Sequence, residues 1–234
     1  MCLAPLTFTR WTDPFVGGLL DVLRWFYPAE DTRRGTDGLP LIRNDFGGVG
    51  NSLSNVIGFD DAPHVRGSAG RVGLIGCVCS GPRLDIVLRD TIEKDGTDAT
   101  DVMAELSRHE DLSHVRGVLL QGITFAGFNV IDIHRLSKTL DLPVLVVTRK
   151  KPRLELVFKA VKAVEGWQAK QALMEAAGEP EACGPVFVQR AGLSHAEAER
   201  MLEATTAHGI IPEPLRLAHL IAGGTTTGKS RGRT

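Results

Sequence analysis

The chain contains few aromatic residues and no long apolar run. Aromatic residues make up 6% of its 234 residues, and no stretch reaches the about 18 consecutive apolar residues that a transmembrane helix needs. The first residues, MCLAPLTFTRWTDPF, lack the charged start and the long apolar run of a secretory signal. The net charge of -1 excludes a protein that is basic all over its surface, although a local basic groove remains compatible with it. We therefore expect a cytoplasmic globular protein that does not enter a membrane.

Cysteine is scarce as well, with four residues at Cys2, Cys77, Cys79 and Cys183. Cys77 and Cys79 lie two residues apart in an apolar segment, so on a strand their side chains point the same way and are poorly placed to form a disulfide. No spacing of Cys and His resembles a zinc site. We expect reduced, buried thiols.

The length suits one domain with an extension, because a single core takes about 100–200 residues. Residues 1–54 are rich in Gly, Pro, Asp and Arg, which is typical of a partly disordered extension or of a start codon assigned too early. Residues 55–223 carry the regular apolar pattern of the domain, and residues 224–234 are predicted to form a flexible basic tail. The stretch GGTTTGKS at 223–230 satisfies the P-loop pattern, but it follows a helix instead of a strand, so we do not expect it to bind a nucleotide.

Three predicted strands precede the first predicted helix. The third one, RLDIVLRDTIEK, alternates apolar and polar residues as a half-exposed strand should. Strands are expected at 55–61, 71–80, 83–94, 115–120, 142–150 and 184–191. Helices are expected at 99–108, 129–140, 154–177, from 195 onward and at 211–224. Ser194 with Glu197 caps the start of the helix from 195, and glycines stop the last helix. This order predicts an α/β fold of the ribonuclease H-like type, a mixed sheet with a three-stranded antiparallel start and then parallel strands, flanked by helices.

Oxygen-bearing side chains stand where three of these strands end. Mg²⁺ prefers hard oxygen ligands from one or two carboxylates together with phosphate and water. The predicted metal-binding and catalytic residues at this edge are Asp60, Asp98, Asp101 and Gln121. The alternative is that Asp60 is an ordinary turn carboxylate, and that Asp98 and Asp101 only serve the start of the helix, as its N-cap and as a first-turn acid.

Basic residues follow the fifth predicted strand. Lys150 is the candidate for holding a phosphate or for stabilising developing negative charge. Arg149 and Lys151 beside it, and Asn129 in the glycine-rich stretch after the fourth strand, are the candidates for contacts with nucleic acid. A solvated strand end explains the basic residues equally well.

Several segments resemble a small, mostly archaeal family of unknown function that is related to endonuclease V. They are IGFDDAPHVRG, DGTDATD, GITFAGFNVIDI, LPVLVVTRKKP, AGLSHAEA and IPEPLRLAHLIA, with SRGR near the end. The resemblance runs from Val56 to Arg233, and residues 1–54 have no counterpart in it.

The resemblance implies a ribonuclease H-like fold and a Mg²⁺-dependent cut of a phosphodiester near a deaminated adenine. Asp60 is similar to the first-strand aspartate of endonuclease V, and Asp98 or Asp101 takes the place of its glutamate at a helix start. Lys150 resembles its lysine after the fifth strand.

The sequence differs from endonuclease V at three places. Gln121 occupies the position of the fourth-strand aspartate and brings no negative charge. The aromatic–proline wedge has no counterpart near Asp95, and the histidine before the penultimate helix is replaced near Ala191–Gly192. The sequence therefore predicts a metal-dependent nuclease acting on nucleic acid, or alternatively a catalytically inactive nucleic-acid-binding or regulatory protein with the same fold.

Overall fold

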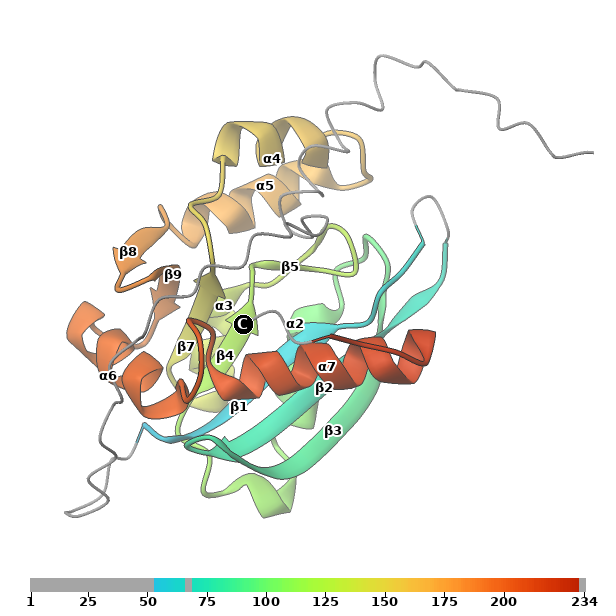
Figure 1. Ribbon diagram of the computed structural model, residues 1–234. Helices are drawn as coiled ribbons and strands as arrows, with labels where there is room; N and C mark the ends of the chain where they lie inside the picture. Colours follow the sequence, from blue (N-terminus) through green and yellow to red (C-terminus); the bar gives the residue numbers. More distant parts are fainter. Residues whose placement is uncertain (1–52, 66–68, 232–234) are drawn as a thin grey trace, which may run out of the picture. The chain divides into compact units, whose positions relative to one another are not determined.

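A seven-stranded mixed sheet organises the computed structural model, which describes residues 53–65 and 69–231 (Figure 1). Its strands, in spatial order, are β3 (Arg83–Glu93), β2 (Arg71–Ser80), β1 (Asn55–Asp61), β4 (Val118–Gln121), β7 (Val144–Thr148), β9 (Val186–Ala191) and β8 (Glu181–Cys183). β1, β2 and β3 form an antiparallel meander, β4 is parallel to β1, and β7 is parallel to β4. This is the ribonuclease H-like order that the sequence predicts. β9 and β8 extend it in antiparallel fashion.

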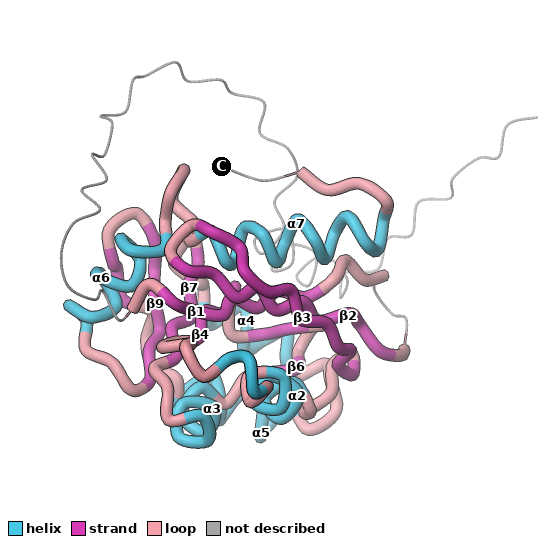
Figure 2. Tube along the Cα trace, turned by 90° about the horizontal axis from the view of Figure 1, so that it is seen from below, coloured by secondary structure: helices cyan, strands magenta, loops and turns pink. Residues whose placement is uncertain are grey.

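Helices cover both faces of this sheet. α6 (His195–Thr205) and α7 (Glu213–Thr227) lie on one face, and α2 (Ala99–Leu106), α3 (Ile133–Leu140) and α5 (Trp167–Ala176) lie on the other (Figure 2). The core under α6 and α7 is built from alternate residues of the central strands with apolar residues of the two helices. It includes Val56, Leu119, Leu145, Val147, Val188, Ala198, Met201 and Leu215.

The two ends of the chain lie partly outside the described residues. The expected extension, residues 1–54, is described only for its last two residues. Helix α4 (Leu154–Val161) is an amphipathic helix. Among the described residues, no helix has the length and apolar character that crossing a membrane requires.

The described cysteines are free and buried, as expected. Cys77, Cys79 and Cys183 form no disulfide, and Cys2 lies outside the described residues. Burial raises the pKa of both Cys77 and Cys79 to about 12. These two thiols are therefore protonated and inert at neutral pH.

Several helix boundaries differ from the prediction by a few residues, and two of the differences have a clear structural cause. The expected helix at 129–140 begins at Ile133, because residues 129–130 form the short strand β6 (Asn129–Val130) paired with β5 (Thr124–Phe125). The last helix does not stop at Gly223–Gly224 but continues to Thr227, and Gly228 with a φ of 74° ends it. A side chain on Gly223 would lie 2.6 Å from Ser230 Oγ, so the glycine accommodates the returning chain instead of breaking the helix. The first residues of the expected tail are thus helical.

α7 packs so closely on β1 that residue 58 has no room for a side chain. A Cβ on Gly58 would lie 2.7 Å from Pro214 Cβ. We expect Gly58→Ala to lower the free energy of unfolding by roughly 1–3 kcal/mol, the usual cost of overpacking a core, as measured by urea denaturation. Gly73→Ala in β2 is the control, because its added Cβ would meet only Ala62 Cβ at 3.4 Å. Equal stability of the two variants would contradict the close packing of α7 on β1.

Candidate functional site

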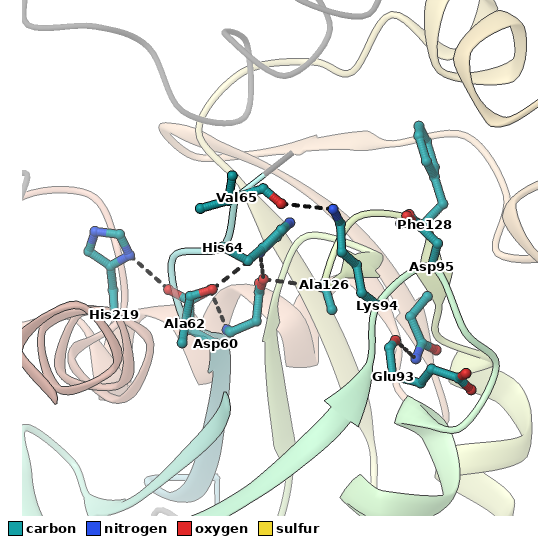
Figure 3. A network of polar contacts seen from close by, with 12 residues as sticks. Asp60, Ala62, His64, Val65, Glu93, Lys94, Asp95, Ala126, Phe128 and His219 are labelled. Carbon is teal, nitrogen blue, oxygen red and sulfur yellow. Dashed lines mark hydrogen bonds and ion pairs between the residues drawn. The ribbon is translucent and has the colours of Figure 1, made fainter. Parts of the chain in front are cut away.

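Asp60, at the end of β1, is paired with a histidine from α7. Its side chain is 2% exposed, and its Oδ2 lies 2.8 Å from His219 Nδ1 (Figure 3). Its Oδ1 accepts a hydrogen bond of 3.0 Å from the backbone N–H of Asp61. Asp60 points to the α7 side of the sheet because it lies two residues after Gly58, which faces Pro214. A carboxylate has about four lone-pair sites, so these two contacts leave Asp60 room for a further ligand.

The surroundings of Asp60 control its charge and the tautomer of His219. Burial raises the pKa of Asp60 to about 6, against the opposing effect of the hydrogen bond with His219. Above that pH the carboxylate is ionised and can only accept, so Nδ1 of His219 carries the proton and donates it to Asp60. Nε2 of a neutral His219 then holds a lone pair, which is the form that a general base requires.

Gln121 lies beside Asp60 on the neighbouring strand. In the parallel register of β1 and β4, Phe59 is opposite Leu120, so the next residue of each strand places Asp60 beside Gln121 on one face. Within residues 53–65 and 69–231, the buried Oε1 atom of Gln121 finds no hydrogen-bond partner. A buried polar atom without a partner is costly and rare, so Oε1 of Gln121 is a candidate ligand atom.

Asp61, the neighbour of Asp60, points to the opposite face of the sheet. Its Oδ2 accepts a hydrogen bond of 3.1 Å from the N–H of Ala126 and lies 3.4 Å from His64 Nδ1. The carboxylate of Asp61 raises the pKa of His64. Asp61 therefore anchors the glycine-rich stretch after β4, while Asp60 alone faces α7.

Asp98 is held in a network of structural contacts. Its carboxylate accepts hydrogen bonds from the N–H of Glu93, at 3.0 Å, and from Asn129 Nδ2, at 2.7 Å, and it pairs with Arg71 at 3.2 Å. Asp98 occupies the N-cap position of α2, but its side chain makes no capping bond. The fully buried Asn129 accepts the hydrogen bond from Ala99 N–H instead. Asn129 is therefore closed off from solvent, whereas the carboxylate of Asp98 is 29% exposed and already bound to three partners.

Asp101 is exposed and pairs with Arg135 of α3 through both guanidinium Nη atoms. It lies on α2, across the sheet from α7 (Figure 2). Among the described residues, no three acidic or histidine side chains bring their ligand atoms within 4.8 Å of one another at this end of the sheet. The structure therefore brings Asp60 and Gln121 together and leaves Asp98 and Asp101 in other contacts.

A buried lysine fixes the corner where the glycine-rich stretch meets the loop after β3. Lys170 of α5 is 2% exposed, and its Nζ donates to the carbonyl oxygens of Asp95 (2.8 Å), Phe128 (2.9 Å) and Gly96. Asp95 Oδ1 accepts a bond of 2.8 Å from Phe128 N–H. A Cβ at Gly127 would lie 2.3 Å from that oxygen. The glycine is therefore required by packing against Asp95.

Basic residues flank the Asp60 end of the sheet. β7 runs parallel to β4, so Lys150 and Lys151, both exposed, follow it at the same sheet edge as Gln121. A surface cavity of about 320 Å³ adjoins the end of β1 and is lined by residues that include His64, Arg71 and Arg89. Both features place positive charge within reach of a polyanion that passes Asp60.

The sequence-based prediction did not include His219. The buried positions of α7 include Leu215, Ala218 and Ala222, and His219 lies one turn after Leu215, at the border of that buried face. The sequence signal that could have identified His219 is a histidine at a core-facing position of an amphipathic helix.

The comparisons with known proteins agree on one family. The family model described as endonuclease dU matches residues 52–226. A UPF0215 protein of Deinococcus radiodurans is 48% identical over 182 residues, which are 77% of this chain and 93% of that protein. A protein of unknown function from Archaeoglobus fulgidus has a solved structure with a TM-score of 0.68 and 34% identity, covering 72% of this chain and 95% of that one. A Ciona intestinalis endonuclease V, solved with inosine-containing DNA, is 15% identical with a TM-score of 0.47 over 70% of this chain and 82% of that one. The chain belongs to the endonuclease dU family.

Proposed function

We propose that the protein is a metal-dependent nuclease whose reaction takes place between β1, β4 and α7. The observation that supports it most is the pairing of the buried Asp60 with His219 beside Oε1 of Gln121, which has no hydrogen-bond partner in the part of the chain that the structure describes. A buried carboxylate next to an unsatisfied oxygen is unfavourable for folding alone, so function is its best explanation.

Mg²⁺ fits the oxygen atoms at this place. Asp60 would supply the carboxylate and Gln121 its neutral Oε1, and phosphate and water would complete the shell, as is usual for Mg²⁺. When bound, the ion would stabilise the negative charge that develops on the phosphate. Asp98 and Asp101 are left out of the proposed site because their carboxylates have other partners.

The side chains of the protein take the remaining roles in this proposal. Asp60 orients His219 through Nδ1, so Nε2 is the atom that accepts a proton from the attacking water. Lys150 contacts the phosphate, and Arg149 and Lys151 contact the neighbouring backbone of the nucleic acid. Arg89, exposed beside the cavity next to β1, extends the same positive track.

The substrate class follows from the family. Its description names an endonuclease and dU, so DNA containing deoxyuridine is the first substrate to assay. The full chain is incubated with end-labelled oligonucleotides that contain deoxyuridine, inosine or neither, in single- and double-stranded form, and with RNA. We expect cleavage in Mg²⁺ and none in chelator. Binding of these oligonucleotides without any cleavage would overturn the nuclease proposal and favour the non-catalytic alternative. The neutral side chain of Gln121, where a carboxylate would bind a metal ion better, supports that alternative.

The charge of residue 121 provides a test that is independent of activity. Gln121→Asp would place a second carboxylate beside Asp60, which destabilises the fold in chelator and is reversed by a bound cation. We expect Mg²⁺ to raise the melting temperature of this variant more than that of the wild type, with a gain of about 2.7 kcal/mol when the ion reaches 100 times its Kd. Gln121→Asn shortens the side chain without adding charge and is the control. An equal Mg²⁺ response of wild type and Gln121→Asp would show that residue 121 does not face a cation.

A further inference from the structure

Strand β8 and helix α6, at the far edge of the sheet, bring together side chains that the nuclease proposal does not use. Glu181 and Cys183 lie two residues apart on β8 and so share one side of the strand. His195 and Glu199 lie four residues apart on α6 and so share one face of the helix. β8 and α6 are neighbours (Figure 1), and β8 is four strands away from β1, roughly 19 Å at the usual strand spacing.

Three of these side chains already converge. One ligand atom each of Cys183, His195 and Glu199 lies within 4.8 Å of the other two. In a tetrahedral zinc site the ligand atoms are roughly 3.3–3.7 Å apart, because zinc lies about 2.0–2.3 Å from each of them. The side chain of Glu199 is half exposed and the imidazole ring of His195 is partly exposed, so both can move to close that gap while Cys183 stays buried.

The surroundings of His195 give an independent reason for a cation. Its Nδ1 lies 3.2 Å from Glu181 Oε2, and its Nε2 lies 3.5 Å from Glu199 Oε1. An imidazolium would donate to both carboxylates, but a neutral imidazole has one N–H and donates to only one of them. Glu181 also pairs with Arg190 at 3.4 Å, so Glu199 is the carboxylate that a neutral His195 leaves without a donor. A metal ion between Nε2 and Glu199 satisfies that carboxylate, and Nδ1–H then donates to Glu181, which is the usual second contact of a metal-bound histidine.

We propose that Cys183, His195 and Glu199 bind one zinc ion, with Glu181 orienting the histidine and the fourth position open to water. Thiolate, imidazole and carboxylate together suit zinc better than Mg²⁺, which prefers oxygen ligands only. Burial raises the pKa of the Cys183 thiol, so zinc has to displace a proton on binding. The ion would fasten the edge strand β8 to α6. This site is separate from Asp60, and the zinc proposal does not depend on the nuclease proposal.

The test is zinc binding by the full chain after dialysis against a chelator. We expect calorimetric titration to show one ion per chain, and Co²⁺ in its place to give the near-ultraviolet absorption of a thiolate–cobalt bond.

Cys183→Ala should abolish that absorption and weaken zinc binding at least 100-fold. Glu199→Gln, on the surface, should weaken binding without risk to folding, and Glu181→Gln should weaken it about 10- to 100-fold. Glu203→Gln, one turn further along α6, is the matched control and should bind as the wild type does.

Two results would overturn the zinc site. The first is a wild-type chain that binds no zinc in stoichiometric amount. The second is zinc binding that Glu199→Gln and Cys183→Ala leave unchanged, because the ion would then be held elsewhere in the chain.

Discussion

Replacing Asp60 by asparagine is expected to abolish cleavage and, at the same time, to make the folded protein more stable at pH 8. Cleavage should fall by about 100-fold or more, because the variant loses both the carboxylate ligand and the group that orients the proposed base. Stability should rise because a buried carboxylate whose pKa is raised from 3.8 to about 6 opposes folding when it is ionised. A shift of this size corresponds to roughly 3 kcal/mol, and the weaker bond to His219 should reduce the gain to about 1–3 kcal/mol.

The pH dependence of this effect has a definite sign. A raised pKa in the folded state means that the folded state binds more protons than the unfolded state between pH 3.8 and about 6. The stability penalty of Asp60 is therefore fully present above about pH 6 and fades as the pH falls toward 3.8. The free energies of unfolding of wild type and Asp60→Asn should differ most at pH 8 and approach each other by pH 4.

The control for Asp60→Asn is the same replacement at an exposed carboxylate. The side chain of Asp111 is 80% exposed, so Asp111→Asn should change neither cleavage nor the pH profile of stability. If Asp60→Asn is less stable than the wild type at pH 8, the carboxylate serves the fold and the functional interpretation of its burial is lost.

Lys170→Met is expected to produce the largest loss of stability. The replacement keeps an unbranched apolar stem but removes the Nζ that donates to three backbone carbonyl oxygens. Bonds from a charged donor contribute about 1.5–3 kcal/mol each, and a buried acceptor left without a donor is costly. The absence of a buried charge in the variant offsets part of this, so we expect a net loss of about 3–5 kcal/mol and a melting temperature lower by about 10 °C.

Lys138→Met supplies the comparison for Lys170→Met. Lys138 is exposed on α3, so the same chemical change there should cost less than about 0.5 kcal/mol. Thermal and urea denaturation of both variants measure the difference. A loss for Lys170→Met as small as that for Lys138→Met would show that water replaces the ammonium group and that the corner does not depend on it.

The periodic part of the fold was predictable from the sequence. Alternation marked β3, continuous apolar runs marked β4 and β7, and the Ser194–Glu197 capping box marked the start of α6. These signals are local, and each element is stabilised by the same burial that produces its pattern. The glycine pair at 223–224 gave a wrong helix end, because the helix continues past it to Thr227 and Gly223 makes room for Ser230 of the returning chain.

Of the candidate site, only the residues whose positions follow from the order of the strands could be predicted from the sequence. The positions of Asp60 and Gln121 follow from two parallel neighbouring strands. His219 comes from a helix that follows β1 by about 160 residues, and no local pattern connects the two. Asp98 and Asp101 looked equivalent to Asp60 as carboxylates at one sheet edge. In the structure they contact Asn129 and Arg135, and these contacts depend on how α2 packs.

The most direct measurement of the central claim is a crystal structure of the protein grown with Mn²⁺, which occupies magnesium sites and scatters anomalously. We expect an anomalous peak about 2.0–2.2 Å from a carboxylate oxygen of Asp60 and from Oε1 of Gln121. We also expect Asp98 to stay bound to Asn129 and Asp101 to stay bound to Arg135. A peak coordinated by Asp98 or Asp101 without Gln121, or no peak beside Asp60 at saturating Mn²⁺, would contradict the proposed metal site.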